Sequence, residues 1–361
     1  MITRTKNYPA NNKLSIDLSK QTLIALWKAN VPHWVWIGSP LWIGAIALGL
    51  DGRNPNWTSL VLFVLTVLTI QCIAEFANSY TDRNEDRLYG PTNTLVTGEL
   101  RATTAKKVLV FQNAIAIALL SSLLLLTHNY ALIGIVAAGW FFSMAYSVPP
   151  FRLKETIFGP FAHAIAFALL PIAGWLIVEP SLTAQNGFML AFASLVFLHS
   201  FAIGIMLKFR KTFLALDSGL IKIKPGSNLH NLRIVGLTLK YKTAIRLEEI
   251  TAIGTFILVP IFWHQGIFSA ALSIGLLAGP LTLTVLAIML RIKHPVDNSA
   301  RYKALMTLAW ILIVVLLLGV GLSQLIHWSF AATACLIFLL GFPFLVRIVH
   351  PWGSKSLNGR Y

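Results

Sequence analysis

Charged residues are scarce in this sequence, and acidic residues are scarcer than basic ones. Of the 361 residues, 12% are charged, only 13 are Asp or Glu, and 56% are hydrophobic. Soluble domains carry about 25% charged residues, so the composition excludes an ordinary soluble protein. The two cysteines, Cys72 and Cys335, both lie in apolar stretches, which indicates core or lipid-facing residues and not a disulfide or a metal site. The sequence has no phosphate-binding loop, dinucleotide fingerprint, zinc-ligand spacing or Ser/His/Asp pattern.

Long apolar runs dominate what is present. Runs of roughly 18 or more apolar residues need a bilayer as their solvent, and their backbone polar groups must be satisfied internally. The runs are continuous and lack the alternation of barrel strands, so they predict helices. The predicted fold class is an all-α integral membrane protein, a multi-span helical bundle. We predict ten spans, at residues 33–50, 57–80, 108–126, 130–146, 159–178, 187–207, 249–263, 268–290, 305–323 and 328–346.

The loops between these spans differ in charge on the two sides of the membrane. The loops on one side contain a single basic residue, Arg53, and the other side holds the remaining 28 of the 29 Lys and Arg residues. Because basic loops stay in the cytoplasm, we expect both termini to be cytoplasmic, in an inner, plasma or internal membrane. This asymmetry also explains the net charge of +16 without nucleic acid as a partner.

The spans divide the chain into three parts. Residues 1–32 form a cytoplasmic leader, 33–325 form the main helical bundle, and 326–361 form an extra C-terminal span with a short cytoplasmic tail. In the leader, Ser19 is placed to cap a short helix through Lys28, with Leu23, Leu26 and Trp27 towards lipid. A solvated leader is the alternative.

The second predicted span ends in a row of oxygen-bearing side chains. Asn78, Asp82 and Asp86 follow at intervals of four residues, with Glu75 one turn deeper, so on a helix they share one face. Such oxygens suit Mg²⁺, which typically binds one or two carboxylates while it bridges substrate phosphates. Ionisable residues in a membrane are candidates for function. The alternative is a polar helix end that meets water.

This row resembles the first aspartate-rich motif of the UbiA superfamily of intramembrane prenyltransferases. The stretch Tyr146-Ser-Val-Pro-Pro-Phe-Arg152-Leu-Lys154 resembles a YSxPPxxLK motif of chlorophyll-synthase-like members, and Gly90-Pro91 with residues 95–100 resembles the segment after the first motif in quinone-pathway members. The resemblance covers roughly residues 28–323. Nine spans are usual in the family, so the tenth is an addition.

The resemblance implies transfer of a prenyl group from an allylic prenyl diphosphate to a lipophilic aromatic or quinone-type acceptor, with Mg²⁺ as cofactor. Tyr146 would stabilise the allylic cation or orient the acceptor, although an interfacial tyrosine is the alternative. Membrane lipids are the other expected partner. The implied ligands are Asn78, Asp82 and Asp86 for the metal, and Arg152 and Lys154 for phosphate oxygens.

One part of the family pattern is missing. The family carries a second DxxxD motif after the sixth span, where this sequence has Lys208-Phe-Arg210-Lys211. In one hypothesis Lys208, Arg210 and Lys211 bind the diphosphate directly, in place of a second Mg²⁺. In another, the usual catalysis is lost and the protein binds a prenyl chain or another lipid. In a third, these basic residues serve membrane topology alone. A UbiA-type terpene cyclase and a transporter are further alternatives. His163 lies inside a span, and we expect it to be buried and paired with a backbone carbonyl.

Overall fold

The computed structural model describes residues 19–30, 33–89, 94–180, 187–217, 239–292 and 315–320, and the single residues 234, 322 and 335. Its regular elements are helices: α1 (Lys20–Asn30), α2 (His33–Leu50), α3 (Trp57–Tyr89), α4 (Thr94–Thr97), α5 (Ala102–Thr127), α6 (Tyr130–Ser147), the 3₁₀ helix η1 (Leu153–Glu155), α7 (Gly159–Leu176), α8 (Gly187–Asp217), α9 (Tyr241–His264) and α10 (Ala270–Ile292). Residues 315–320 are also helical.

Six of these helices are long and apolar enough to cross a bilayer. They include Trp57–Asn84 of α3, all of α5, α6 and α7, Gly187–Phe209 of α8 and Ala270–Met289 of α10. Their outward faces are apolar as well: on α5, Val110, Phe111 and Leu125 are each more than 60% exposed. Such apolar faces fit lipid and not water. The protein is therefore an all-α, multi-pass membrane protein, as its hydropathy predicts.

The helices extend beyond several predicted spans. The first predicted span coincides with α2, but α3 continues past residue 80 to Tyr89, α8 continues past 207 to Asp217, and α9 begins at Tyr241, before residue 249. Hydropathy measures only the part of a helix that lies in apolar surroundings, whereas backbone hydrogen bonding extends beyond it. The predicted spans 305–323 and 328–346 lie outside the described residues, apart from 315–320, 322 and 335.

Helix α1 occurs where the leader sequence predicts a helix. The Ser19 hydroxyl accepts the backbone N–H of Thr22 at 3.3 Å, which is the expected cap contact. Ala25 and Ala29 are buried, whereas Leu23 and Trp27 are exposed. Its location at a membrane surface stays a prediction.

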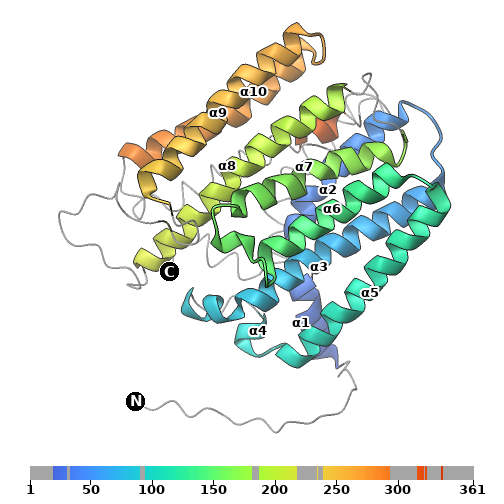
Figure 1. Ribbon diagram of the computed structural model, residues 1–361, viewed down its shortest axis with the longest axis vertical. Helices are drawn as coiled ribbons and strands as arrows, with labels where there is room; N and C mark the ends of the chain where they lie inside the picture. Colours follow the sequence, from blue (N-terminus) through green and yellow to red (C-terminus); the bar gives the residue numbers. More distant parts are fainter. Residues whose placement is uncertain are drawn as a thin grey trace.

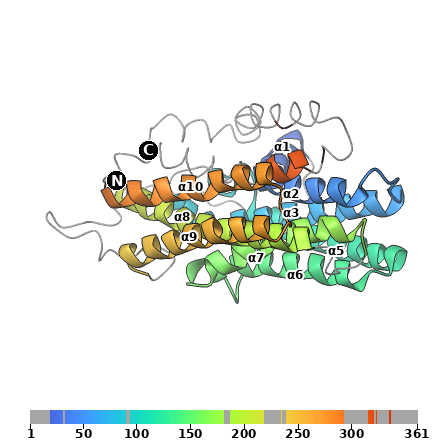
Figure 2. The same cartoon turned by 90° about the horizontal axis from the view of Figure 1, so that it is seen from above.

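The long helices run alongside one another in a single bundle (Figures 1 and 2). Helices α9 and α10 pair on one side, α3 pairs with α5, and α7 packs against α2, α6 and α8. The α2–α7 contact is close: a Cβ on Gly174 would lie 2.4 Å from the Trp42 carbonyl oxygen. Helices α1 and α4 both pack against α3 at one end of the bundle (Figure 1).

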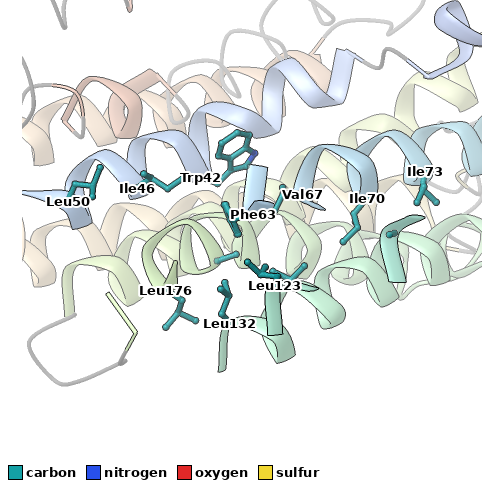
Figure 3. Close-up of a cluster of buried hydrophobic side chains, with 13 residues drawn as sticks. Trp42, Ile46, Leu50, Phe63, Val67, Ile70, Ile73, Leu123, Leu132 and Leu176 are labelled. Carbon is teal, nitrogen blue, oxygen red and sulfur yellow. The ribbon is translucent and has the colours of Figure 1, made fainter. Parts of the chain in front are cut away.

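One buried cluster joins five helices around Phe63 (Figure 3). The Trp42 ring from α2 meets the Phe63 ring from α3 edge-on, with centroids 6.1 Å apart. Leu123, Leu132 and Leu176 bring in α5, α6 and α7. Helix α3 packs directly against α6, and α6 packs against α7. The segment that connects α6 to α7 contributes to the site described next.

Candidate active site

The polar row of α3 begins beside the connection between α6 and α7. Asn78 Oδ1 accepts hydrogen bonds from Ser147 Oγ at 2.9 Å and from Lys154 Nζ at 3.0 Å. Lys154 Nζ also donates to Asp82 Oδ1 and forms an ion pair with it. Asp82 is 6% exposed and Lys154 2% exposed. One ammonium group thus bridges an amide oxygen and a carboxylate that α3 places one helical turn apart.

The connection from α6 to α7 delivers these basic side chains through a tight turn. A cis peptide joins Pro149 to Pro150, and Arg152 has a φ of +40°, in the left-handed region that non-glycine residues seldom adopt. From this turn Arg152 Nη2 lies 3.7 Å from Asp82 Oδ1. Gly159 at the start of α7 leaves room for η1, because a Cβ there would lie 2.9 Å from the Lys154 Cα.

Helix α8 adds a second buried ammonium. Lys208 is 2% exposed, and its Nζ donates to the backbone carbonyl of Lys154. The same Nζ lies 5.7 Å from the centroid of the Tyr146 ring, within the range of a cation–π contact. Lys154 and Arg152 therefore lie beside Asp82, and Lys208 lies beside the Lys154 backbone.

A row of aromatic side chains begins at Tyr146, beside this cluster, and follows α7. The Tyr146 ring lies 6.1 Å from the His163 ring, which lies 4.8 Å from the Phe167 ring. His163 Nδ1 is 3.0 Å from the Ser200 carbonyl oxygen, so the predicted pairing of this histidine with a backbone carbonyl is confirmed. The cationic groups thus adjoin a row of rings that extends into the bundle.

The structure gathers most of the residues that the sequence singles out. Those brought together in one cluster are Asn78, Asp82, Tyr146, Arg152, Lys154 and Lys208. Asp86 lies one turn further along α3. Arg210 and Lys211 belong to α8, but their side chains lie outside the described residues. Sequence reasoning assigned no role to Ser147, although it stands inside the Tyr146–Lys154 motif.

Amide and carboxylate oxygens are the metal-binding groups that this cluster offers. In the part of the chain that the structure describes, no group of three or more His, Cys, Asp or Glu side chains is placed to hold a metal. Oxygens of Asn78 and Asp82 nevertheless converge on one cation, the Lys154 ammonium. A set of one amide and two carboxylates, with Asp86, suits Mg²⁺, which prefers oxygen ligands and keeps several positions for water or phosphate.

Comparison with known proteins agrees with this architecture. The model of the UbiA prenyltransferase family matches residues 38–308. The chain therefore belongs to the UbiA prenyltransferase family. No curated protein sequence matches it.

Solved structures with the same fold are distant in sequence. One is a UbiA homologue from Archaeoglobus fulgidus bound to GPP and Mg²⁺, with 17% identity and a TM-score of 0.58 over 83% of this chain and 99% of the other. The same homologue bound to DMAPP and Mg²⁺ has a TM-score of 0.57 at 17% identity, over 83% and 99%. A digeranylgeranylglyceryl phosphate synthase also has a TM-score of 0.57, at 13% identity over 84% and 99%.

Proposed function

We propose that this protein transfers a prenyl group from an allylic prenyl diphosphate to a lipophilic aromatic or quinone-type acceptor, with Mg²⁺ as cofactor. The observation that carries the proposal is one cluster of cations and oxygens. Lys154 contacts Asp82 and Asn78, Arg152 lies 3.7 Å from Asp82, and Lys208 contacts the Lys154 backbone. Family membership supports prenyl transfer. The structures that contain GPP or DMAPP with Mg²⁺ support the donor class and the metal.

Asn78, Asp82 and Asp86 hold the metal in this proposal. Bound Mg²⁺ supplies positive charge to the phosphate oxygens as the diphosphate departs. Arg152 and Lys208 bind other phosphate oxygens, because fixed cations in a site shielded from water stabilise developing negative charge. Arg210 and Lys211 on α8 are proposed to extend this set.

The reaction breaks the bond between the allylic carbon and the diphosphate oxygen, and the electron pair leaves with that oxygen. The resulting allylic cation faces the Tyr146 ring, which attracts positive charge through its π electrons. A carbon of the acceptor then bonds to the allylic carbon and releases a proton, which the departing diphosphate accepts. The rings of Tyr146, His163 and Phe167 suit an apolar chain or a flat acceptor.

The active-site end of the bundle faces the cytoplasm in this proposal. The loop that carries Arg152 and Lys154 is on the basic side of the predicted topology, whereas Arg53 and Glu179, which pair at 2.9 Å, mark the opposite side. Prenyl diphosphates are anionic and water-soluble at one end, so a site at the cytoplasmic edge accepts the headgroup from water and the chain from lipid.

The test is turnover of a prenyl diphosphate by purified protein with Mg²⁺ and candidate aromatic acceptors, followed by mass spectrometry of lipid products. We expect Asp82→Asn to lower turnover by at least about 100-fold, since metal ions and charge clamps contribute several kcal/mol to such reactions. Chelation of Mg²⁺ should abolish turnover. The matched control is Glu179→Gln, which removes a paired carboxylate at the other end of the bundle and should leave turnover unchanged.

The products distinguish this proposal from its alternatives. A prenylated acceptor supports prenyl transfer, and a cyclised hydrocarbon formed without acceptor indicates a terpene cyclase. Binding of prenyl diphosphate without any product indicates a lipid-binding protein. Turnover that continues unchanged in chelator or in Asp82→Asn would remove the metal and the α3 row from the mechanism.

A further inference from the structure

The position that a metal ion needs in this site is already filled by a charge of the protein. Lys154 Nζ contacts both Asn78 Oδ1, at 3.0 Å, and Asp82 Oδ1. These are the oxygens assigned above to the metal. A divalent cation and an ammonium group cannot bind the same two oxygens closely at once, since like charges at contact distance repel strongly where water is excluded.

Burial explains why an ammonium occupies this place. Asp82 is 6% exposed and Lys154 2% exposed, and a buried carboxylate without a counter-charge is strongly destabilising. Lys154 therefore neutralises Asp82 whenever no metal is bound. Ser147 Oγ, 2.9 Å from Asn78 Oδ1, holds the amide oxygen in place.

The backbone around Lys154 is held while its side chain can turn. Lys208 Nζ donates to the Lys154 carbonyl oxygen, and Gly159 at the start of α7 packs against the Lys154 Cα. The four-carbon side chain of lysine has several rotatable bonds. Rotation of this side chain moves the ammonium off Asp82 while the backbone keeps its contacts, and Arg152, 3.7 Å from Asp82, offers a diphosphate a second cation beside it.

We propose that Lys154 is a positioning residue that exchanges partners: it contacts the proposed metal ligands Asn78 and Asp82 when Mg²⁺ is absent and moves to the diphosphate when Mg²⁺ binds. This inference rests on the proposed function. Its consequence is that metal and diphosphate bind as a pair. Metal alone displaces the Lys154 ammonium from Asp82 and Asn78, whereas the diphosphate supplies an anion that the displaced ammonium then contacts.

The experiment measures binding and needs no turnover. Mn²⁺ replaces Mg²⁺ as a probe, and its affinity for the purified protein is measured by electron paramagnetic resonance without diphosphate. Inorganic pyrophosphate affinity is then measured by calorimetry at saturating Mn²⁺. In Lys154→Met we expect Mn²⁺ alone to bind about tenfold more tightly or better, because the competing charge is gone, and pyrophosphate to bind about tenfold more weakly.

Two further variants secure the interpretation. Lys154→Gln keeps an N–H donor for Asn78 while it removes the charge, so it tests the same idea if the Met variant does not fold. Lys28→Met removes an ammonium that pairs with Glu99 at 2.8 Å and serves as the matched control, with both affinities unchanged. Melting temperature in detergent verifies that each variant is folded.

The opposite direction of the two changes distinguishes the exchange from simpler roles. If Lys154 only binds phosphate, pyrophosphate affinity falls and Mn²⁺ affinity stays constant, which overturns the inference. If Lys154 is only structural, both affinities fall, which also overturns it. A wild-type protein that binds neither Mn²⁺ nor pyrophosphate overturns the proposed function itself, and this outcome is distinct from the other two.

Discussion

Replacement of Lys208 by Met is the sharpest test of how this site binds a diphosphate. Lys208 is 2% exposed and stands where sequence comparison expects an acidic motif. Its Nζ contacts the Lys154 carbonyl oxygen and lies 5.7 Å from the Tyr146 ring centroid. Met has similar length and no charge, so Lys208→Met removes the ammonium with little change in packing.

The expected effect follows from the contacts that Lys208 makes before and after binding. A hydrogen bond to a charged group contributes about 1.5–3 kcal/mol, which corresponds to about a 10- to 100-fold change in affinity. The contact with Tyr146 is made within the protein itself, so its loss affects the stability of the fold more than the affinity for ligand. We therefore expect about a 10- to 100-fold loss of pyrophosphate affinity in Lys208→Met, and a smaller loss in Lys208→Arg.

Calorimetric titration with pyrophosphate at saturating Mg²⁺ measures this change, and a melting curve in detergent separates it from unfolding. If folded Lys208→Met binds pyrophosphate as tightly as the wild type, the lysine does not bind the diphosphate, and its charge serves topology or packing alone. A loss equal in Lys208→Met and Lys28→Met would assign the effect to net charge, and would refute a specific contact as well.

Two predictions concern the fold. Gly174→Ala should lower the melting temperature and destabilise the protein by about 1–3 kcal/mol, because its Cβ would lie 2.4 Å from the Trp42 carbonyl oxygen. The control Gly134→Ala, whose Cβ would have no neighbour within 4 Å, should be neutral or stabilising. Equal melting temperatures of the two variants would contradict the close α2–α7 contact. Phe63 is fully buried in the cluster of Figure 3, so Phe63→Ala should destabilise the protein by about 2 kcal/mol through lost packing. Phe111 lies on an exposed face, so Phe111→Ala should have little effect. A denaturation series measures both changes.

The polar row of α3 is the part of the site that the sequence predicts best. Asn78, Asp82 and Asp86 repeat every four residues, and the helix continues through them to Tyr89, so their common face follows from helical geometry alone. The sequence also indicates that Arg152 and Lys154 lie on the same side of the membrane, because alternate loops share a side. Both inferences need only local periodicity and hydropathy.

The ion pair between Lys154 and Asp82 could not be predicted from the sequence. Lys154 is predicted to contact phosphate, and the structure pairs it with Asp82 and Asn78. No spacing rule predicts this pair, since it joins residues 72 positions apart through a turn with a cis peptide and a left-handed Arg152. Ser147 was given no role for the same reason: a hydroxyl beside a motif shows its function only when its partner is placed.

The amino-acid sequence by itself determined that this chain forms membrane-spanning helices and that one of them carries a row of oxygen-bearing side chains, because hydropathy and helical period are properties of neighbouring residues. Only the tertiary structure decided which cations meet that row. Lys154 of η1 contacts Asp82 of α3, and Lys208 of α8 contacts the Lys154 backbone. Contacts between segments so distant in the chain depend on how the whole bundle packs.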